Sequence, residues 1–249
     1  MTPELRSYPD PSTLAQAVAA DWLASLGQSL KRPPGDQPYA VALSGGRIAR
    51  DFFTEIARQS QKSKGVYRDI FQRVHFFWAD ERCVPPTDPE SNYRVARELL
   101  FEPLNIPAGQ IHRIRGEENE ALALRDAVEN ICAVAPPKLG KGPPVLDLIF
   151  LGMGEDGHVA SLFPGEPPEV MASPDIYRAV TAVKPPPRRI TMGYGVLAAA
   201  QGVWVLASGK GKEQALRESL APQGKTPLAR VLRSRSGRET RVYTDMMTG

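Results

Sequence analysis

The sequence predicts an α/β protein built on one doubly wound, mostly parallel sheet with helices on both of its faces. At least five short apolar runs have the length and composition of buried strands. Segments whose apolar residues recur at helical spacing separate these runs along the chain. Such alternation is typical of parallel sheets, because a helix usually carries the chain back to the start of the next strand.

The composition fits a single domain that covers residues 1–249. The chain has 249 residues, of which 42% are hydrophobic, and α/β domains commonly reach this length. Its net charge of +3 is too small to indicate nucleic acid or another polyanion as a partner. Cys83 and Cys132, the two cysteines, show neither a disulfide framework nor the spacing of a metal site. The N-terminus carries no apolar signal segment and no run reaches about 18 apolar residues, so we expect a soluble cytoplasmic protein without a membrane partner.

The first predicted elements are an amphipathic helix and a buried strand. Apolar residues recur at every fourth position from Leu14 to Leu30. Ser12 or Thr13 can cap the start of this helix, and Pro33-Pro34 ends it. Residues 39–43 then form a short apolar strand.

The turn after this strand is a candidate anion site. Ser44-Gly45-Gly46-Arg47 stands between the strand and a second helix, whose apolar residues begin at Ile48. This order directs several backbone N–H groups and the positive end of a helix at one point, which suits a phosphate. The alternative is an ordinary strand-to-helix turn in which glycine supplies a positive φ angle.

A second predicted strand, residues 73–78, is followed closely by an acid and a guanidinium. In an extended chain Asp80 and Arg82 point to one side and Glu81 points to the other. The pair forms either a structural ion pair or a clamp for a substrate. Farther along, Ser91-Asn92 is suited to cap a third helix.

Three segments then lead to the centre of the sequence. Residues 111–115 alternate in polarity, which predicts a third strand. Residues 121–134 carry an apolar stripe at helical spacing and predict a helix. Residues 135–144 are rich in proline, glycine and lysine and are expected to form a surface connection.

The strongest motif, residues 152–165, follows the apolar run 145–151. It therefore lies at the carboxyl end of a predicted strand, where open α/β sheets bind their ligands. Its Gly-x-Gly-x-x-Gly spacing fits a dinucleotide site, but Pro164-Gly165 interrupts the helix that such a site requires. The remaining alternatives concern His158, which is either a capping or core residue or an acid–base group facing a cleft.

A proline-rich segment follows the motif. A predicted strand at 179–183 leads into Lys184-Pro185-Pro186-Pro187, and these prolines would present Arg188 and Arg189 at the mouth of a helix. The segment either docks a polyproline-binding partner or holds an arginine where a phosphate can reach it.

The C-terminal part contains the last clear parallel strand, residues 203–207. Ser208-Gly209-Lys210-Gly211-Lys212 follows it and opens a helix over 213–220. The tail 228–241 is dense in arginine but has no interleaved aromatic residues, which favours a solvated helix face and turn over a nucleic-acid site. Residues 240–244 are expected to form a final edge strand.

The 152–165 segment resembles the signature of 6-phosphogluconolactonases, and four further motifs occur in the order typical of that family. They are Ser44-Gly45-Gly46, Asp80-Glu81-Arg82, Arg189-Ile190-Thr191, and the Gly-x-x-Lys pattern of Gly209 and Lys212. The family commonly has Ser-Thr-Pro after the glycines, where this chain has Arg47-Ile48-Ala49. A threonine hydroxyl is thus missing, and Arg47 either supplies compensating charge or lies in solvent. The wider relatives, glucosamine-6-phosphate deaminases, share a Rossmann-like sheet but place an aromatic residue where Arg82 stands, which favours the lactonase.

The resemblance implies hydrolysis of 6-phospho-D-glucono-1,5-lactone to 6-phospho-D-gluconate, the second step of the oxidative pentose phosphate pathway. In this interpretation His158 is the general base that activates water, and Asp156 orients the imidazole or binds a sugar hydroxyl. Arg82 stabilises the oxyanion or holds a hydroxyl, and Asp80 holds Arg82 in place or contacts the sugar. The expected phosphate ligands are Ser44, Gly45, Gly46, Arg47, Arg189 and Lys212, the last favoured over Lys210.

The resemblance also implies that the enzyme needs no cofactor and no metal, and that it is a monomer or a weak homodimer. Two alternatives remain at this point. One is an enzyme that acts on glucosamine 6-phosphate as a deaminase or isomerase. The other is a protein that binds a sugar phosphate without turning it over.

Overall fold

The computed structural model describes residues 3–29, 38–63, 67–137, 140–235 and 237–246. Within them, six strands form one parallel sheet in the order β1-β9-β8-β5-β2-β3. Its strands, in chain order, are β1 (Glu4–Ser7), β2 (Tyr39–Leu43), β3 (Val74–Trp78), β5 (Leu148–Gly152), β8 (Gly202–Ala207) and β9 (Glu239–Thr244). The predicted α/β fold with a mostly parallel sheet is confirmed.

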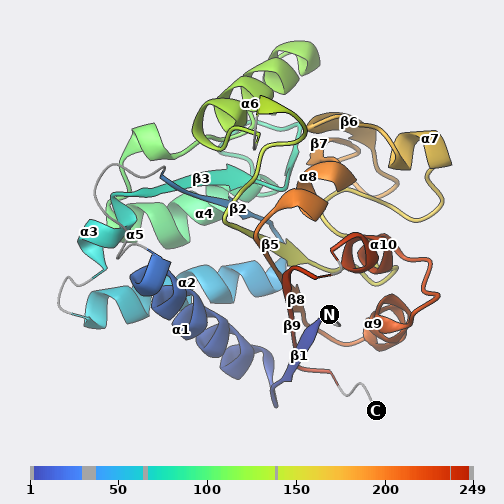
Figure 1. Ribbon diagram of the computed structural model, residues 1–249. Coiled ribbons are helices and arrows are strands. Elements are labelled where there is room, and N and C mark those ends of the chain that lie inside the picture. The colour runs from blue at the N-terminus through green and yellow to red at the C-terminus, as the bar shows by residue number, and fades with distance from the viewer. Residues whose placement is uncertain (1–2, 30–37, 64–66, 138–139, 236, 247–249) are drawn as a thin grey trace.

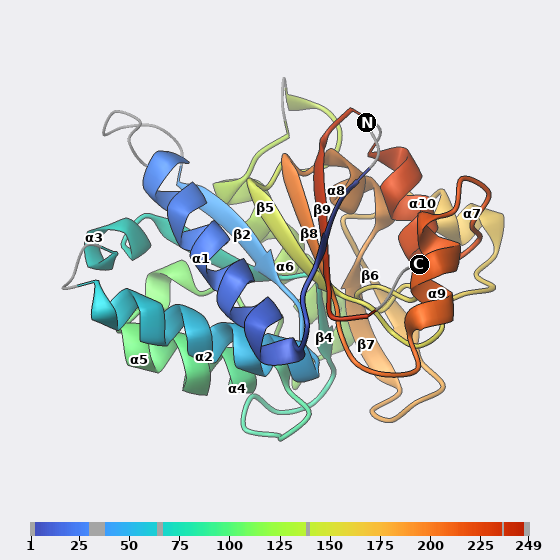
Figure 2. The same ribbon diagram turned by 90° about the horizontal axis from the view of Figure 1, so that it is seen from below.

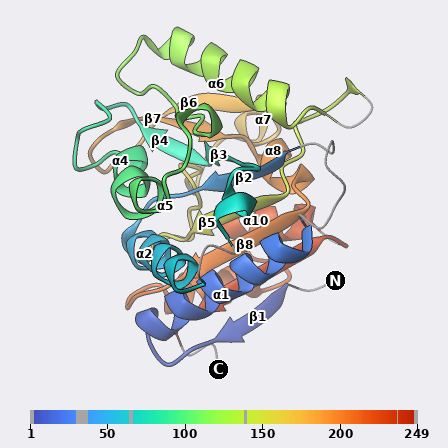
Figure 3. The same ribbon diagram turned by 90° about the vertical axis from the view of Figure 1, so that its left-hand side faces the viewer.

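Helices cover both faces of this sheet. Helices α1 and α2 lie on one side, and α6 and α8 lie on the other (Figures 1 and 3). Near β8 and β9, α9 and α10 lie side by side (Figure 2). The longer helices are α1 (Pro11–Ser29), α2 (Arg47–Lys62), α6 (Glu120–Val134), α8 (Tyr194–Ala199), α9 (Glu213–Leu220) and α10 (Pro227–Ser234). The shorter ones are α3 (Arg68–Phe71), α4 (Asn92–Ala96), the π-helix η1 (Arg97–Phe101), α5 (Glu102–Leu104), the 3₁₀ helix η2 (Ala108–Gln110) and α7 (Pro168–Met171).

The hydrophobic core forms where the apolar stripe of α1 meets the sheet. Every residue of β2 is buried, as expected for a strand covered on both faces. Trp22 on α1 is fully buried and packs edge-on against Phe76 of β3 and Phe150 of β5. These contacts fix α1 across the strands that carry the site residues.

A second, antiparallel sheet of three strands lies beside the first. It contains β4 (Asp80–Arg82), β7 (Arg188–Met192) and β6 (Tyr177–Thr181) in that order. The expectation that Arg188 and Arg189 stand in a loop at the mouth of a helix is wrong, because they begin β7. The antiparallel pairing of β7 with β4 places Arg189 opposite Arg82. The small sheet therefore brings two arginines from distant parts of the sequence to one place.

Several local predictions are also corrected. Residues 111–115 do not form a strand; Ile111 makes a single bridge to Phe76, and the chain then leaves the sheet. The last strand is not an edge strand, because β1 pairs with β9 on its outer side. Asp10 caps α1 by accepting a hydrogen bond from the Thr13 backbone, so neither predicted capping residue holds that position.

The arginine-rich tail is not simply a solvated face. Arg235 is only 1% exposed, and its guanidinium donates to the carbonyl oxygens of Leu197, Ala200 and Glu239 at 2.7 to 2.8 Å. This arginine therefore joins α10 to the end of α8 and the start of β9. The predicted stop at Pro33-Pro34 lies outside the described residues. Among the residues that are described, none of the helices is long and apolar enough to cross a membrane.

Candidate active site

A cavity of about 500 Å³ opens at the carboxyl ends of the central strands. One side is lined by residues that follow β2, β5 and β8, among them Ser44, Met153 and Ser208. The small antiparallel sheet supplies the other side through Asp80, Arg82 and Arg189. The cavity therefore lies where ligands bind in open α/β sheets.

The turn between β2 and α2 lines one end of the cavity and has a geometry suited to an anion. Gly46 precedes α2 with a φ of 105°, a conformation that favours glycine. A Cβ at Gly45 would stand 1.9 Å from Oδ1 of Asn92, so this position has no room for a side chain. The Ser44 hydroxyl is buried and has no hydrogen-bond partner in the part of the chain that the structure describes. The turn thus presents a free hydroxyl and the first N–H groups of a long helix to the cavity.

Two cationic side chains lie at the same end. Lys212, just before α9, and Arg47, at the start of α2, both line the cavity. Burial lowers the pKa of the Lys212 amine, and the positive charge of Arg47 lowers it further. Neither side chain makes an ion pair with any described residue. Two unpaired cations beside free N–H groups are suited to a phosphate dianion.

His158 lies on the compact loop that follows β5. The Gly154 N–H donates to the carbonyl of His158, and the Gly157 N–H donates to the carbonyl of Gly154. The imidazole lies over Gly154, where a Cβ would stand 2.0 Å from Cε1 of His158. Gly157 has a φ of 78° and packs against Thr226. The glycine spacing of this motif therefore folds the loop around its histidine.

Asp156 holds the imidazole of His158. The Nδ1 of His158 is 2.6 Å from Oδ1 of Asp156, which also accepts from the His158 backbone N–H at 3.1 Å. Burial alone would raise the pKa of Asp156, but these hydrogen bonds and the histidine charge outweigh burial and lower it. Because Nδ1 donates to the carboxylate in the neutral ring, the lone pair of Nε2 remains available to accept a proton. The ring of Phe163, centred 5.0 Å away, packs against the imidazole.

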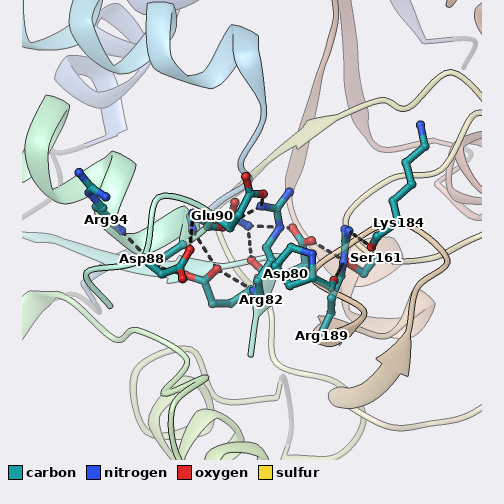
Figure 4. A network of polar contacts seen from close by, with 12 residues as sticks. Asp80, Arg82, Asp88, Glu90, Arg94, Ser161, Lys184 and Arg189 are labelled. Carbon is teal, nitrogen blue, oxygen red and sulfur yellow. Dashed lines mark hydrogen bonds and ion pairs between the residues drawn. The ribbon is translucent and has the colours of Figure 1, made fainter. Parts of the chain in front are cut away.

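Arg82 and Arg189 lie together on the small sheet (Figure 4). Arg82 donates through Nη1 to the carbonyl of Glu90 at 2.7 Å and pairs with its carboxylate at 3.2 Å. The buried Nε of Arg82 has no partner among the described residues. Arg189 donates to the carbonyls of Pro186 and Lys184, each at 3.1 Å. Burial lowers the pKa of Arg189, and the adjacent Arg82 adds to this effect.

Asp80 is buried and contacts neighbours other than Arg82. Its Oδ2 accepts from the hydroxyl of Ser161 at 2.7 Å, and its backbone carbonyl accepts from the Asn92 carboxamide at 2.9 Å. The next residue, Glu81, accepts backbone hydrogen bonds from Arg82, Asn92 and Tyr93. Glu81 therefore anchors the start of α4.

The structure brings the predicted site residues together. The predicted residues Ser44, Gly45, Gly46, Arg47, Asp80, Arg82, His158, Arg189 and Lys212 all line the cavity. Asp156 lines an adjoining cavity and reaches the site through His158. Lys210, the less favoured lysine, is exposed and is absent from the lining.

Sequence reasoning missed two residues of this region. Asn92 was predicted only as part of a helix cap, yet it lines the cavity. Ser161, part of the motif after β5, was given no role, yet it contacts Asp80. Its position inside the motif was the only available signal. The described residues include no cluster of three or more His, Cys, Asp or Glu side chains suited to a metal ion.

Comparisons with known proteins identify a family that this chain matches. Residues 9–242 match the family described as glucosamine-6-phosphate isomerases/6-phosphogluconolactonase. A 6-phosphogluconolactonase of Treponema pallidum is 33% identical over 90% of this chain and 89% of its own length. One of Haemophilus influenzae is 43% identical over 129 residues, which are 52% of this chain and 51% of that protein.

The chain also resembles a solved structure of a 6-phosphogluconolactonase. The 6-phosphogluconolactonase of Trypanosoma brucei superposes with a TM-score of 0.80 and 26% identity, and the match covers 98% of this chain and 96% of that one. The family match spans the cavity residues from Ser44 to Lys212 and the whole small sheet, and of the large sheet it leaves out β1 and the end of β9. The chain belongs to the glucosamine-6-phosphate isomerase/6-phosphogluconolactonase family.

Proposed function

We propose that this protein hydrolyses 6-phospho-D-glucono-1,5-lactone to 6-phospho-D-gluconate, with residues 1–249 acting as one domain. The observation that carries the proposal is the pairing, within one cavity, of an oriented imidazole with a separate group of unpaired cations. The imidazole is suited to activate a water molecule for attack on a carbonyl. The cations are suited to bind a phosphate at the other end of the substrate. The names of the relatives support the same substrate.

In the proposed mechanism, Nε2 of His158 takes a proton from a water molecule as its oxygen attacks the lactone carbonyl. The tetrahedral intermediate carries a negative oxygen, which the Arg82 guanidinium stabilises. The carbonyl then re-forms and the bond between C1 and the ring oxygen breaks. His158 returns the proton to that oxygen, which becomes a hydroxyl, and the new acid ionises to the carboxylate.

Asp156 holds the neutral imidazole with Nε2 free, so it acts through His158. This assignment is favoured over a sugar contact by the 2.6 Å hydrogen bond. The developing positive charge on the imidazole is stabilised by the same carboxylate.

The phosphate group is proposed to bind the turn of Ser44, Gly45 and Gly46 together with three cations, Arg47, Lys212 and Arg189. The threonine of the common family pattern is replaced by Ile48, and the contact of its missing hydroxyl is proposed to be compensated by the charge of Arg47. The Nη2 of Arg47 lies 3.6 Å from where a Cβ would stand at Gly209, which supports a position over the phosphate site. Binding energy at this end orients the carbonyl at the other. All of these groups come from one chain, so the proposed reaction is compatible with the expected monomer or weak homodimer.

The test measures hydrolysis of freshly generated lactone. The release of acid is recorded over time, and the rate of spontaneous ring opening is subtracted. The wild-type protein should accelerate ring opening, and His158→Ala should lower kcat by roughly 10²–10⁴, the usual share of a general base, with little change in KM. Wild-type rates in the His158 variant would overturn the assigned role. Release of ammonia from glucosamine 6-phosphate would instead favour the deaminase alternative. Binding of a sugar phosphate without turnover of either substrate would favour a sensor.

A further inference from the structure

Ser161 connects the histidine loop to the small antiparallel sheet. It follows His158 by three residues, and its side chain is completely buried. Its hydroxyl donates to Oδ2 of Asp80 at 2.7 Å (Figure 4). Its backbone N–H donates to the Thr191 hydroxyl at 3.2 Å. Asp80 and Thr191 are paired residues of β4 and β7. Ser161 therefore contacts both of these strands at one point.

The backbone before Ser161 accounts for this arrangement. Ala160 has a φ of 49°, which is in the left-handed region and is uncommon for a residue with a side chain. The reversal at Ala160 allows His158 to line the cavity while Ser161 is buried against β4 and β7. A conformation of this kind is retained only when the surrounding contacts hold it.

Asp80 is oriented by neighbouring protein groups. Its Oδ2 is 2.7 Å from the hydroxyl of Ser161, and its Oδ1 is 3.5 Å from the carboxamide nitrogen of Asn92. The residue is only 5% exposed. A hydrogen bond to a carboxylate in such a setting is stronger than one between neutral groups.

We propose that Ser161 and Asp80 form a clamp that sets the position of His158 relative to Arg82 and Arg189. In this proposal, which rests on the proposed lactone hydrolysis, both are positioning residues, and Asp80 acts through Ser161 without touching the substrate. The loop of His158 belongs to the large sheet, whereas the two arginines belong to the small one. The clamp is a direct polar link between the histidine motif and β4, which carries Arg82.

Catalysis should depend strongly on the distance between His158 and Arg82, because a displacement of about 1 Å at reacting groups can lower a rate about 10²-fold. We therefore expect Ser161→Ala and Asp80→Ala each to lower kcat about 10- to 100-fold. KM for the lactone should change less than kcat, since Arg189 is the one proposed phosphate ligand on the small sheet, whereas Arg47, Lys212 and the turn of Ser44 to Gly46 lie outside the clamp.

A double-mutant cycle tests the link between the two residues. If both act through one hydrogen bond, the double variant Ser161→Ala/Asp80→Ala should be no slower than the slower single variant. Effects that multiply, or either single variant with wild-type kcat, would overturn the clamp. Ser60→Ala is the control, since Ser60 is also a buried serine, on α2, and lies outside the cavity lining.

Asp80→Asn separates positioning from direct contact with the substrate. The carboxamide keeps an oxygen that can accept from Ser161 but loses the negative charge. The clamp predicts that Asp80→Asn retains kcat within about fivefold of wild type, well above Asp80→Ala. Equal loss in the two variants would show that the charge itself meets the substrate, contrary to the proposal. If Ser161→Ala does not fold, Thr191→Val removes the other anchor of Ser161 with little change of volume and is expected to lower kcat in the same way.

Urea unfolding of the same set of variants keeps this test separate from the proposed function. Loss of the Ser161–Asp80 bond should appear as a non-additive change in unfolding free energy, whatever reaction the protein catalyses. A wild-type protein without lactonase activity would overturn the proposed function while this coupling was still measured. Coupling in stability without any loss of kcat would instead overturn the clamp as a positioning device.

Discussion

The Nδ1 atom of His158 lies 2.6 Å from Oδ1 of Asp156, two residues earlier on the same loop. A single carboxylate oxygen thus receives both the ring and the backbone N–H of the histidine. The imidazole is therefore held by a residue of its own loop. A separate contact, the hydrogen bond of Ser161 to Asp80, joins this loop to β4.

Asp156→Asn should lower kcat about 10²-fold or more. The new carboxamide can donate to Nδ1, which would place the ring proton on Nε2 and remove the acceptor that the mechanism needs. The comparison variant is Asp156→Ala, which frees the ring without imposing a tautomer and should be no slower than Asp156→Asn. Steady-state kinetics on the lactone measure both; an asparagine variant that is faster than the alanine variant would contradict the orienting role.

Lys212→Ala should mainly raise KM, by about 10- to 100-fold, with a smaller effect on kcat. The lysine makes no ion pair with any described residue and lines the cavity together with Arg47 and the turn of Ser44 to Gly46. Lys210→Ala is the matched control, because Lys210 is exposed on the same loop and should give wild-type values. Inhibition by inorganic phosphate provides a second measurement, and it should weaken only in the Lys212 variant. Equal effects of the two substitutions would show that general surface charge is responsible.

The protein should lose stability as the pH falls from about 6.5 to about 4 through His112. Burial, and next the charge of His75, lower the pKa of His112 to about 4, whereas an unfolded histidine titrates near 6.5. The unfolded state therefore binds the proton first, and the stabilising neutral form is fully present only above about pH 6.5. In the folded protein the ring of His112 stacks on that of Phe77, with the two ring centres 4.6 Å apart. The Nε2 atom of His112 lies 2.8 Å from Nδ1 of His75.

His112→Phe removes this group and can keep the stacking. Urea unfolding at pH 7 and pH 4.5 should show a smaller loss of stability in this variant than in the wild type. His158→Ala, which leaves the His75–His112 pair intact, serves as the control. An unchanged loss in the His112 variant would mean that other groups govern the acid sensitivity.

Arg235→Met should lower the free energy of unfolding by about 3 kcal/mol or more, because several buried carbonyl oxygens would lose a charged donor at once. Burial is also what lowers the pKa of this guanidinium to about 10. Arg125→Met, on an exposed part of α6, should change stability by no more than about 0.5 kcal/mol. The folded Arg235 variant should retain kcat, since Arg235 does not line the cavity. Urea titrations at pH 7 measure the difference.

The large sheet was predictable because its inner strands are apolar runs buried on both faces. Residues 39–43, for example, are entirely buried and were predicted with their observed bounds. The strand β1 was missed because it lies at an edge, and its alternating charges resemble a surface loop. For residues 111–115 the error was the opposite one, because a strand was predicted where none forms. The polarity alternates there, but only Ile111 pairs with a neighbouring strand.

The site was predictable as a set of residues but not as a set of contacts. Sequence motifs at strand ends identified nine residues that line the cavity. The short antiparallel sheet gave little signal, because β4 has only three residues and β7 follows a proline-rich segment. Long-range pairs such as Ser161 with Asp80 depend on that sheet, so no local pattern could indicate them.

The pairing of β1 with β9 also constrains the order in which the molecule can assemble. Residues 4–7 of the first strand meet residues 241–244 of the last one, so this contact joins nearly opposite ends of the numbering. On a ribosome, the first strand must wait without its neighbour until residues 241–244 have emerged. Contacts of such sequence separation form slowly, so completion of this edge is expected to be a late event in biosynthesis.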